Sequence, residues 1–151
     1  MRVDFYQLGA APVEQVVASL SEKLLRTGER LLVVLDDEAE LARLDRMLWD
    51  MGETTFLPHG VAGGPEDSRQ PILLSKSPDS ANRARNLLIA DGHWRDSALA
   101  FNRAFYLFDA ETLEEARGAW RALAGRDEVE RHYFSHEDGR WTEKAADSQP
   151  A

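Results

Sequence analysis

Two arginines beside a tryptophan form the group in this sequence that most clearly predicts a binding site. Arg117 and Arg121 are one helical turn apart, and Trp120 lies between them. Like charges at this spacing repel mildly, so grouping them costs some stability. Guanidinium groups bind carboxylates in a bidentate manner, and an indole ring offers apolar surface. The pattern therefore predicts an apolar pocket with an arginine rim, suited to a short acidic peptide that ends in an aromatic residue or a free carboxylate.

A plainer interpretation of the same residues stays open. On a solvated helix face, Arg117 would form an ion pair with Glu114 one turn earlier, and no ligand would be involved. Three further aromatic residues, Trp49, Phe56 and Phe108, also lie near the ends of predicted elements. This concentration of aromatic and arginine residues favours the pocket as the hypothesis to test.

A second candidate site is an acidic pair. Asp36 and Asp37 follow the apolar segment 31–35, and open α/β sheets bind ligands at the carboxyl ends of their strands. The alternative function is therefore a small α/β enzyme, or a protein that binds a nucleotide or another ligand near Asp36. Capping of the following helix explains the pair equally well. The sequence has no Gly-x-Ser-x-Gly nucleophile motif, and we predict no catalytic residue.

Motifs for cofactors and metals are incomplete. The turn 9–12, Gly-Ala-Ala-Pro, has a single glycine and so lacks the dinucleotide fingerprint. The glycine-rich segment 59–65 lacks the Gly-Lys-Ser/Thr ending of a phosphate loop. There are no cysteines. His132 and His136 are four residues apart with Glu137 and Asp138 beside them, but the segment 135–139 is turn-like, and on a strand the two histidines would not converge with a third ligand. We therefore predict no cofactor and no metal site.

Composition narrows the choice of partners. The chain has 151 residues, of which 43% are hydrophobic and 30% charged, an ordinary balance for one globular domain. Its 27 acidic and 18 basic side chains give a net charge of −9, which disfavours direct binding to a phosphate backbone. No apolar run is long enough to cross a bilayer, and the N-terminus lacks the pattern of a secretory leader. The sequence thus predicts a cytoplasmic protein that contacts no membrane.

Apolar periodicity predicts elements that alternate between strands and helices. Three segments with helical spacing of apolar residues each end at a glycine: 12–28, 37–52 and 112–125. Further apolar segments predict strands at 3–8, 31–35, 54–57, 71–74, 86–89 and 105–108, a helix at 96–103, and a loop at 59–70. Thr112 and Glu115 have the spacing of a capping box.

These elements predict one domain of the α/β class. We expect a Rossmann-like three-layer structure with a mostly parallel central sheet and no nucleotide-binding glycine motif, spanning residues 1–145. A hairpin is predicted from Tyr133 to Trp141 around Asp138-Gly139. Residues 146–151 are expected to be a disordered tail.

Four motifs resemble one known family. They are Val3-Asp4-Phe5-Tyr6, Leu44-Asp45-Arg46-Met47-Leu48-Trp49, Phe56-Leu57-Pro58-His59-Gly60 and Ala116-Arg117-Gly118-Ala119-Trp120-Arg121. Their order is similar to that in the chi subunit of bacterial DNA polymerase III, over Val3 to about Leu123. The L-D-x-x-L-W and F-x-P-H pair at this spacing is the most specific part of the resemblance.

The resemblance implies a non-catalytic accessory subunit of the clamp-loader complex, with a Rossmann-like fold that has no nucleotide site. Chi proteins bind the acidic, Phe-ending C-terminal tail of single-stranded-DNA-binding protein (SSB), and in many bacteria a small subunit called psi. The expected partners are thus the SSB tail and clamp-loader subunits, psi among them, with DNA contacted only indirectly.

By position, the resemblance also implies which residues bind the tail. The expected SSB tail site consists of Trp49, Phe56, Pro58, Phe108, Arg117, Trp120 and Arg121. Arg117 is expected to contact the tail carboxylates. Trp120 and Phe56 are expected to form walls around the terminal phenylalanine.

Overall fold

Apolar segments of the sequence form an eight-stranded sheet, and the amphipathic segments between them form helices. The computed structural model describes residues 1–51 and 57–147. The helices in these ranges are α1 (Val13–Arg26), α2 (Glu38–Asp50) and α3 (Leu113–Ala122), with short 3₁₀ helices η2 (Asp67–Arg69) and η3 (Asp96–Ala100). The strands are β1 (Arg2–Gln7), β2 (Leu31–Val34), β3 (His59–Val61), β4 (Ile72–Ser75), β5 (Asn86–Ile89), β6 (Arg103–Phe108), β7 (Glu130–Glu137) and β8 (Arg140–Ala146).

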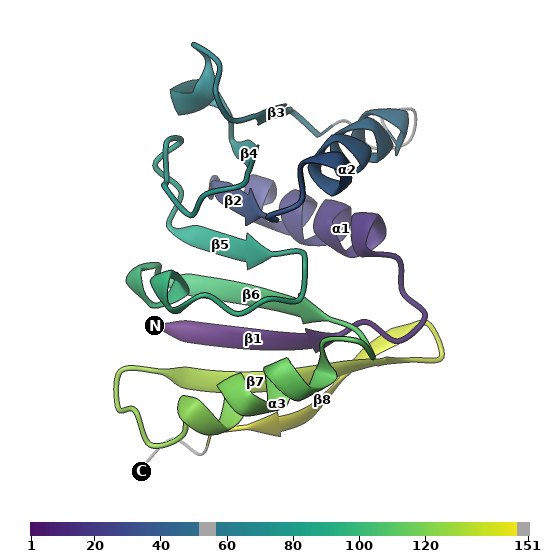
Figure 1. The fold of residues 1–151 in the computed structure, drawn as a ribbon, viewed down its shortest axis with the longest axis vertical. Coiled ribbons are helices and arrows are strands. Elements are labelled where there is room, and N and C mark those ends of the chain that lie inside the picture. Colours follow the sequence, from purple (N-terminus) through teal and green to yellow (C-terminus); the bar gives the residue numbers. More distant parts are fainter. Residues whose placement is uncertain (52–56, 148–151) are drawn as a thin grey trace.

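The central sheet is mostly parallel. Its strands lie in the order β3-β4-β2-β5-β6-β1-β7-β8, and β7 with β8 is the one antiparallel pair among the described strands. The N-terminal strand β1 therefore lies inside the sheet, between β6 and β7 (Figure 1). In this register Phe5 lies opposite Tyr106 on β6 and opposite Tyr133 on β7. Three segments distant in the sequence thus form one aromatic row.

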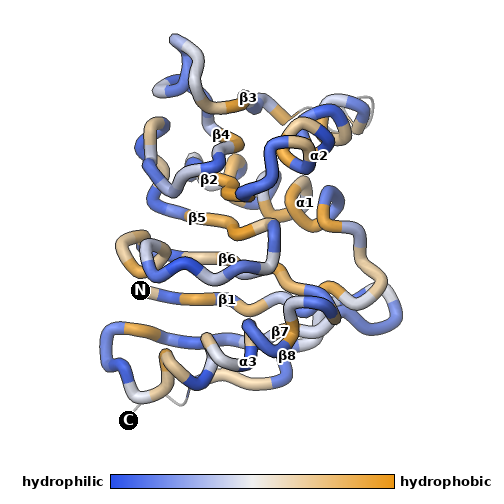
Figure 2. Tube along the Cα trace, viewed as in Figure 1, coloured by the Kyte–Doolittle hydropathy of each residue, from blue (hydrophilic) through white to orange (hydrophobic). Residues whose placement is uncertain are grey.

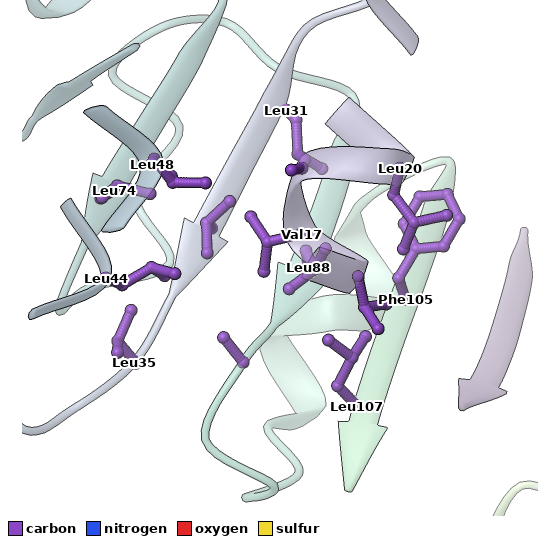
Figure 3. Close-up of a cluster of buried hydrophobic side chains, with 14 of the residues drawn as sticks. Val17, Leu20, Leu31, Leu35, Leu44, Leu48, Leu74, Leu88, Phe105 and Leu107 are labelled. Carbon is purple, nitrogen blue, oxygen red and sulfur yellow. The ribbon is translucent and has the colours of Figure 1, made fainter. Parts of the chain in front are cut away.

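Helices cover the two faces of the sheet and form two separate apolar cores. On one face α1 and α2 pack on the strands, where Val17, Leu44 and Leu48 lie close to Leu74 and Leu88 (Figure 3). On the other face α3 and η3 pack largely through small alanine side chains. Figure 2 shows hydrophobic residues along β2 and β5 and hydrophilic residues in the connecting loops. Because the two cores lie on different faces, α2 and α3 lie on opposite faces of the sheet.

Several sequence predictions are confirmed. The structure has the predicted mixed α/β class and mostly parallel sheet. The Asp37 side chain caps α2 by accepting hydrogen bonds from the amides of Ala39 and Glu40, at 2.8 and 3.0 Å. The hairpin turn falls on Asp138 and Gly139, both with positive φ, as a two-residue turn of this kind requires.

Two predicted elements need correction. The segment 59–70, expected to be a loop, contains η2 and also β3, which pairs with β4. This strand has only three residues, too few to produce a recognisable periodicity. The helix expected at 96–103 is shortened to η3, because β6 already begins at Arg103. The strand expected at 54–57 falls largely on residues 54–56, which lie outside the described residues.

The predicted capping box at the start of α3 is wrong. Thr112 makes no cap bond; its Oγ1 accepts from the Asp109 amide and donates to the Asp109 carboxylate, both at 3.1 Å. Glu115 instead accepts from the amide of Trp94 at 2.7 Å. The two side chains therefore fix the preceding loops, and α3 lacks the side-chain cap that α2 has.

The C-terminal hairpin extends beyond its predicted end. Ala146 is the last residue of β8, and the Asp147 side chain bonds to Arg131 on β7. These two residues belong to the hairpin rather than to the predicted tail; residues 148–151 lie outside the described residues. Within the described ranges, none of the helices is long and apolar enough to span a membrane.

Candidate functional site

The structure places three of the predicted site residues together on α3: Arg117, Trp120 and Arg121, which we call the α3 surface. Trp120 is partly buried, because its side chain points under the helix toward β1 and β7. Its ring centroid lies 5.2 Å from that of Phe5 and 5.8 Å from that of Tyr133, both edge to face. The indole is thus anchored on the aromatic rings of β1 and β7.

The two arginines of the α3 surface are exposed. The Arg117 side chain is 56% exposed and donates a 3.0 Å hydrogen bond to Glu114, the ion pair that the plainer interpretation predicted. Burial raises the pKa of the Tyr133 hydroxyl, and the charge of Arg117 acts against this rise.

Phe108 does not line this surface. It ends β6 on the same sheet face, but its side chain is 1% exposed. Its ring centroid lies 5.7 Å from that of Tyr133 and 6.5 Å from that of Phe5. The end of a strand is not an exposed position here, because α3 and the loop before it cover β6. Phe108 is therefore a core residue beneath the α3 surface.

Trp49 and Pro58 lie on the opposite face of the sheet, and we call them the α2 surface. Trp49 is 53% exposed near the end of α2, and its ring centroid lies 4.4 Å from that of His59. The buried His59 ring lies 2.8 Å from the Leu57 carbonyl through Nδ1 and 3.1 Å from an Asp45 oxygen through Nε2. Pro58, between Leu57 and His59, is partly buried.

The predicted residues therefore do not line a single pocket. α2 packs against β4 near one end of the sheet, and Trp120 of α3 packs over β1 and β7 on the other face (Figure 1). The sheet itself separates the α2 surface from the α3 surface. Phe56, which was expected to face Trp120 across the ligand, lies outside the described residues.

A cavity of about 840 Å³ lies at the carboxyl ends of the strands, where the alternative ligand site was predicted. Its lining includes Asp36, Asp37, Asp91 and Asp109. Three of these carboxylates bind backbone amides nearby: Asp37 caps α2, and Asp91 and Asp109 accept from the loops around them. These hydrogen bonds give Asp37, Asp91 and Asp109 a structural role at this edge of the sheet that requires no ligand.

Asp91 illustrates this structural role. Burial would raise its pKa, but hydrogen bonds from Arg95 and from the amides of Asp36 and His93 outweigh that effect and hold the pKa below its usual range. The Arg95 bonds are 3.0 and 2.8 Å long. Asp91 is thus a charged acceptor at neutral pH that joins two loops.

The two histidines considered as metal ligands have other partners. His132 contacts the carboxylates of Glu130 and Glu143, and His136 packs edge to face on Trp141. Over residues 1–51 and 57–147, no three His, Cys, Asp or Glu side chains are grouped so that they could hold a metal ion.

Sequence reasoning missed a further cation at the α3 surface. The Arg131 guanidinium lies over the Trp120 ring, 4.1 Å from its centroid, and bonds to Asp147. The available signal was alternation, because Arg131 is two residues before Tyr133 on one strand and so shares its face. The partner Asp147 gave no signal, since it follows the strand at the far end of the hairpin.

The fold and these surfaces define a small α/β protein whose exposed aromatic and arginine side chains suit binding to another protein. A family model described as DNA polymerase III chi subunit, HolC, matches residues 1–129. The chain belongs to this family, as the resemblance predicted. It is therefore an accessory replication subunit and not itself catalytic, so the enzyme alternative is set aside.

Relatives of the chain carry the same description. It is 28% identical to DNA polymerase III subunit chi of Escherichia coli (strain K12) over 117 residues, covering 76% of this chain and 80% of the relative. It is 36% identical to the subunit of that name in Pseudomonas aeruginosa over 91 residues, covering 58% of this chain and 62% of the relative. The family match ends one residue before β7, so the C-terminal hairpin lies beyond it.

Proposed function

We propose that this chain binds the acidic C-terminal tail of SSB and thereby links SSB to the clamp loader. The α3 surface is the proposed contact for the tail. Clamp-loader subunits, psi among them, are the proposed partners on the polymerase side. Membership in the chi family supports the assignment to replication, and the chemistry of the surface supports an acidic ligand.

One observation carries the proposal: exposed Arg117 and Arg121 flank Trp120 on a single helix. Arg117 is held by Glu114 in an exposed ion pair, which contributes about 0–1 kcal/mol. Exchange of the Glu114 carboxylate for a ligand carboxylate therefore costs little. On a chain with a net charge of −9, such local guanidinium groups are needed to hold an acidic peptide.

The α2 surface is the competing location for the tail on the same protein. Trp49 is one of two large hydrophobic side chains exposed in the described part of the chain, and exposed tryptophans are common anchors in interfaces. Because the two surfaces lie on opposite faces, point variants can separate them.

The test is a titration of a fluorescent acidic peptide that ends in phenylalanine with a free carboxylate, followed by anisotropy. Arg117→Ala is expected to weaken binding at least about fivefold, since it removes a charge-assisted contact. Arg43→Ala is the matched control, because Arg43 forms an equally exposed pair with Glu40 on α2. It is expected to change affinity less than about twofold.

The outcomes separate the hypotheses. A loss of binding in Trp49→Ala, with Arg117→Ala unchanged, would assign the tail to the α2 surface. No binding of the peptide to the unmodified chain at low salt would overturn the proposed function. Added salt is expected to weaken the interaction, because screening reduces the attraction between guanidinium and carboxylate groups.

A further inference from the structure

Arg131 covers one face of the Trp120 ring. It is the second residue of β7 and points to the sheet face that carries α3. Its guanidinium carbon lies 4.1 Å from the indole centroid, and NH1 donates a 2.7 Å hydrogen bond to the Trp120 carbonyl. A ligand that stacks on this face of the indole must therefore displace the Arg131 side chain, or bind Arg131 in place of its present hydrogen-bond partners.

Asp147 holds Arg131 in this position. Its Oδ1 accepts from Nε and NH2 of Arg131 at 2.9 and 2.7 Å, and its Oδ2 accepts from the Arg131 amide at 2.6 Å. The two side chains are 14% and 26% exposed. These hydrogen bonds lower the pKa of Asp147, which therefore stays charged. The contact is a partly buried carboxylate–guanidinium pair beside an indole.

This pair has the same chemistry as the proposed complex, in which peptide carboxylates contact guanidinium groups beside Trp120. We propose that Asp147 is an internal competitor: it occupies, in the free chain, a carboxylate position of the α3 surface, and an acidic peptide displaces it from Arg131. Arg131 is then a further peptide-binding residue. This inference rests on the proposed function and adds the regulation of that site.

The geometry allows Asp147 to leave without opening the sheet. Asp147 follows the last residue of β8, and its backbone bond to Arg131 is the terminal one of the hairpin, at 3.0 Å. The pairs from His132 to Glu137 with β8 do not depend on it. Because the competitor is part of the chain, the measured peptide affinity equals the intrinsic affinity multiplied by the fraction of molecules in which Asp147 has left Arg131.

The experiment compares Asp147→Asn with the unmodified full-length chain in the anisotropy titration. Asparagine is nearly the same size but lacks the charge, so peptide affinity is expected to rise about three- to tenfold. Asp127→Asn is the matched control. Asp127 and Asp147 line the same cavity, but within the described residues the Arg131 side chain is hydrogen-bonded to Asp147 and Trp120 and not to Asp127. This control is expected to change affinity less than about twofold.

A second measurement uses the unmodified chain and so does not depend on how a variant folds. NMR signals of the Arg131 Nε–H and the Trp120 indole N–H are followed while peptide is added, and both are expected to shift together. An unmoved Arg131 signal at peptide saturation would overturn the competition.

Failure of this inference differs from failure of the proposed function. If the unmodified chain and Asp147→Asn bind the peptide equally, the chain still binds the tail but Asp147 does not compete, and the Arg117→Ala and Trp49→Ala variants decide which surface binds it. If neither binds, the proposed function and this inference fail together. Arg131→Gln is expected to weaken binding about threefold or more; a gain in affinity would show that Arg131 only blocks the indole.

Discussion

α2 and α3 carry similar residues in opposite surroundings. Each has a tryptophan in its last turns and an exposed Glu–Arg pair three residues apart. Trp49 on α2 is 53% exposed, and its one ring contact among the described residues is a tilted one with His59. Trp120 on α3 packs on Phe5 and Tyr133 and lies under Arg131. Neighbouring strands, rather than the residue type, decide what each indole can do.

The two helices also differ in what stabilises them. α2 has the Asp37 cap and buries three leucines, whereas α3 has no side-chain cap and buries alanines. Small side chains bury less apolar area, so α3 depends more on Trp120 and on the strand β7 beneath it. Trp120 of the α3 surface therefore helps to hold α3 on the sheet. Trp49 of the α2 surface is mostly exposed, and α2 is held on the sheet by its leucines instead.

The largest expected effect is on stability when each tryptophan is truncated. Trp120→Ala is expected to lower the free energy of unfolding by about 3 kcal/mol, because it leaves a cavity between α3 and the sheet. Trp49→Ala is expected to cost less than about 0.5 kcal/mol, since its ring is mostly in water. Urea denaturation measures both. Equal losses would contradict the difference between the two helices.

The cap of α2 gives the next effect. Asp37→Ala is expected to destabilise the chain by about 1 kcal/mol, because two amides at the start of α2 lose their acceptor. Asp36→Ala is the control, since it removes the neighbouring carboxylate and leaves the cap in place. Urea midpoints of the two variants provide the comparison, and identical midpoints would show that the cap is not what stabilises α2.

In α3 a substitution is expected to stabilise the chain. A Cβ added at Gly118 would meet no atom within 4 Å, so Gly118→Ala is expected to gain about 0.5–1 kcal/mol from helix propensity alone. At Gly92 a Cβ would lie 2.5 Å from Thr112 Oγ1, and φ is +78°, so Gly92→Ala is expected to destabilise. Thermal unfolding should shift in opposite directions for the two variants.

The smallest effect concerns the hairpin on the α3 side. Burial opposes protonation of His132, but its hydrogen bonds to Glu130 and Glu143 outweigh this and raise its pKa above the ordinary 6.5. A raised pKa stabilises the fold fully below pH 6.5, and this contribution is lost as pH rises through the raised value. His132→Gln is expected to cost roughly 0.5 kcal/mol at pH 6 and less at pH 9. A difference that is constant across this range would exclude the linkage.

The sequence predicts the buried part of the fold well. The strand 86–89 is predicted at its observed bounds, because its apolar run Leu87-Leu88-Ile89, next to polar residues, is typical of a strand covered on both faces. β3 is missed because its pairing with β4 depends on the neighbouring strand and not on its own pattern. The capping box fails because Glu115, in the first turn of α3, accepts a hydrogen bond from the Trp94 amide, which lies in a loop 21 residues earlier in the sequence.

The site is predicted less well, for a physical reason. Local periodicity shows which side of α2 or α3 is apolar, but it does not show which face of the sheet each helix covers. That choice depends on strand order and on the path of each crossover, so Trp49 and Trp120 were grouped in one pocket. Arg131 was missed because its contacts with Trp120 and Asp147 join three separate segments.

The position of β1 inside the sheet has a consequence for synthesis of the chain. β1 pairs with β6 and β7, which are made much later and end at residues 108 and 137. Until β6 has been translated, Val3 and Phe5 have no partner strand, and their second partner comes only with β7. Contacts of such high sequence separation slow folding, so the segment of β1 remains open to aggregation or to chaperones until these partner strands have been made.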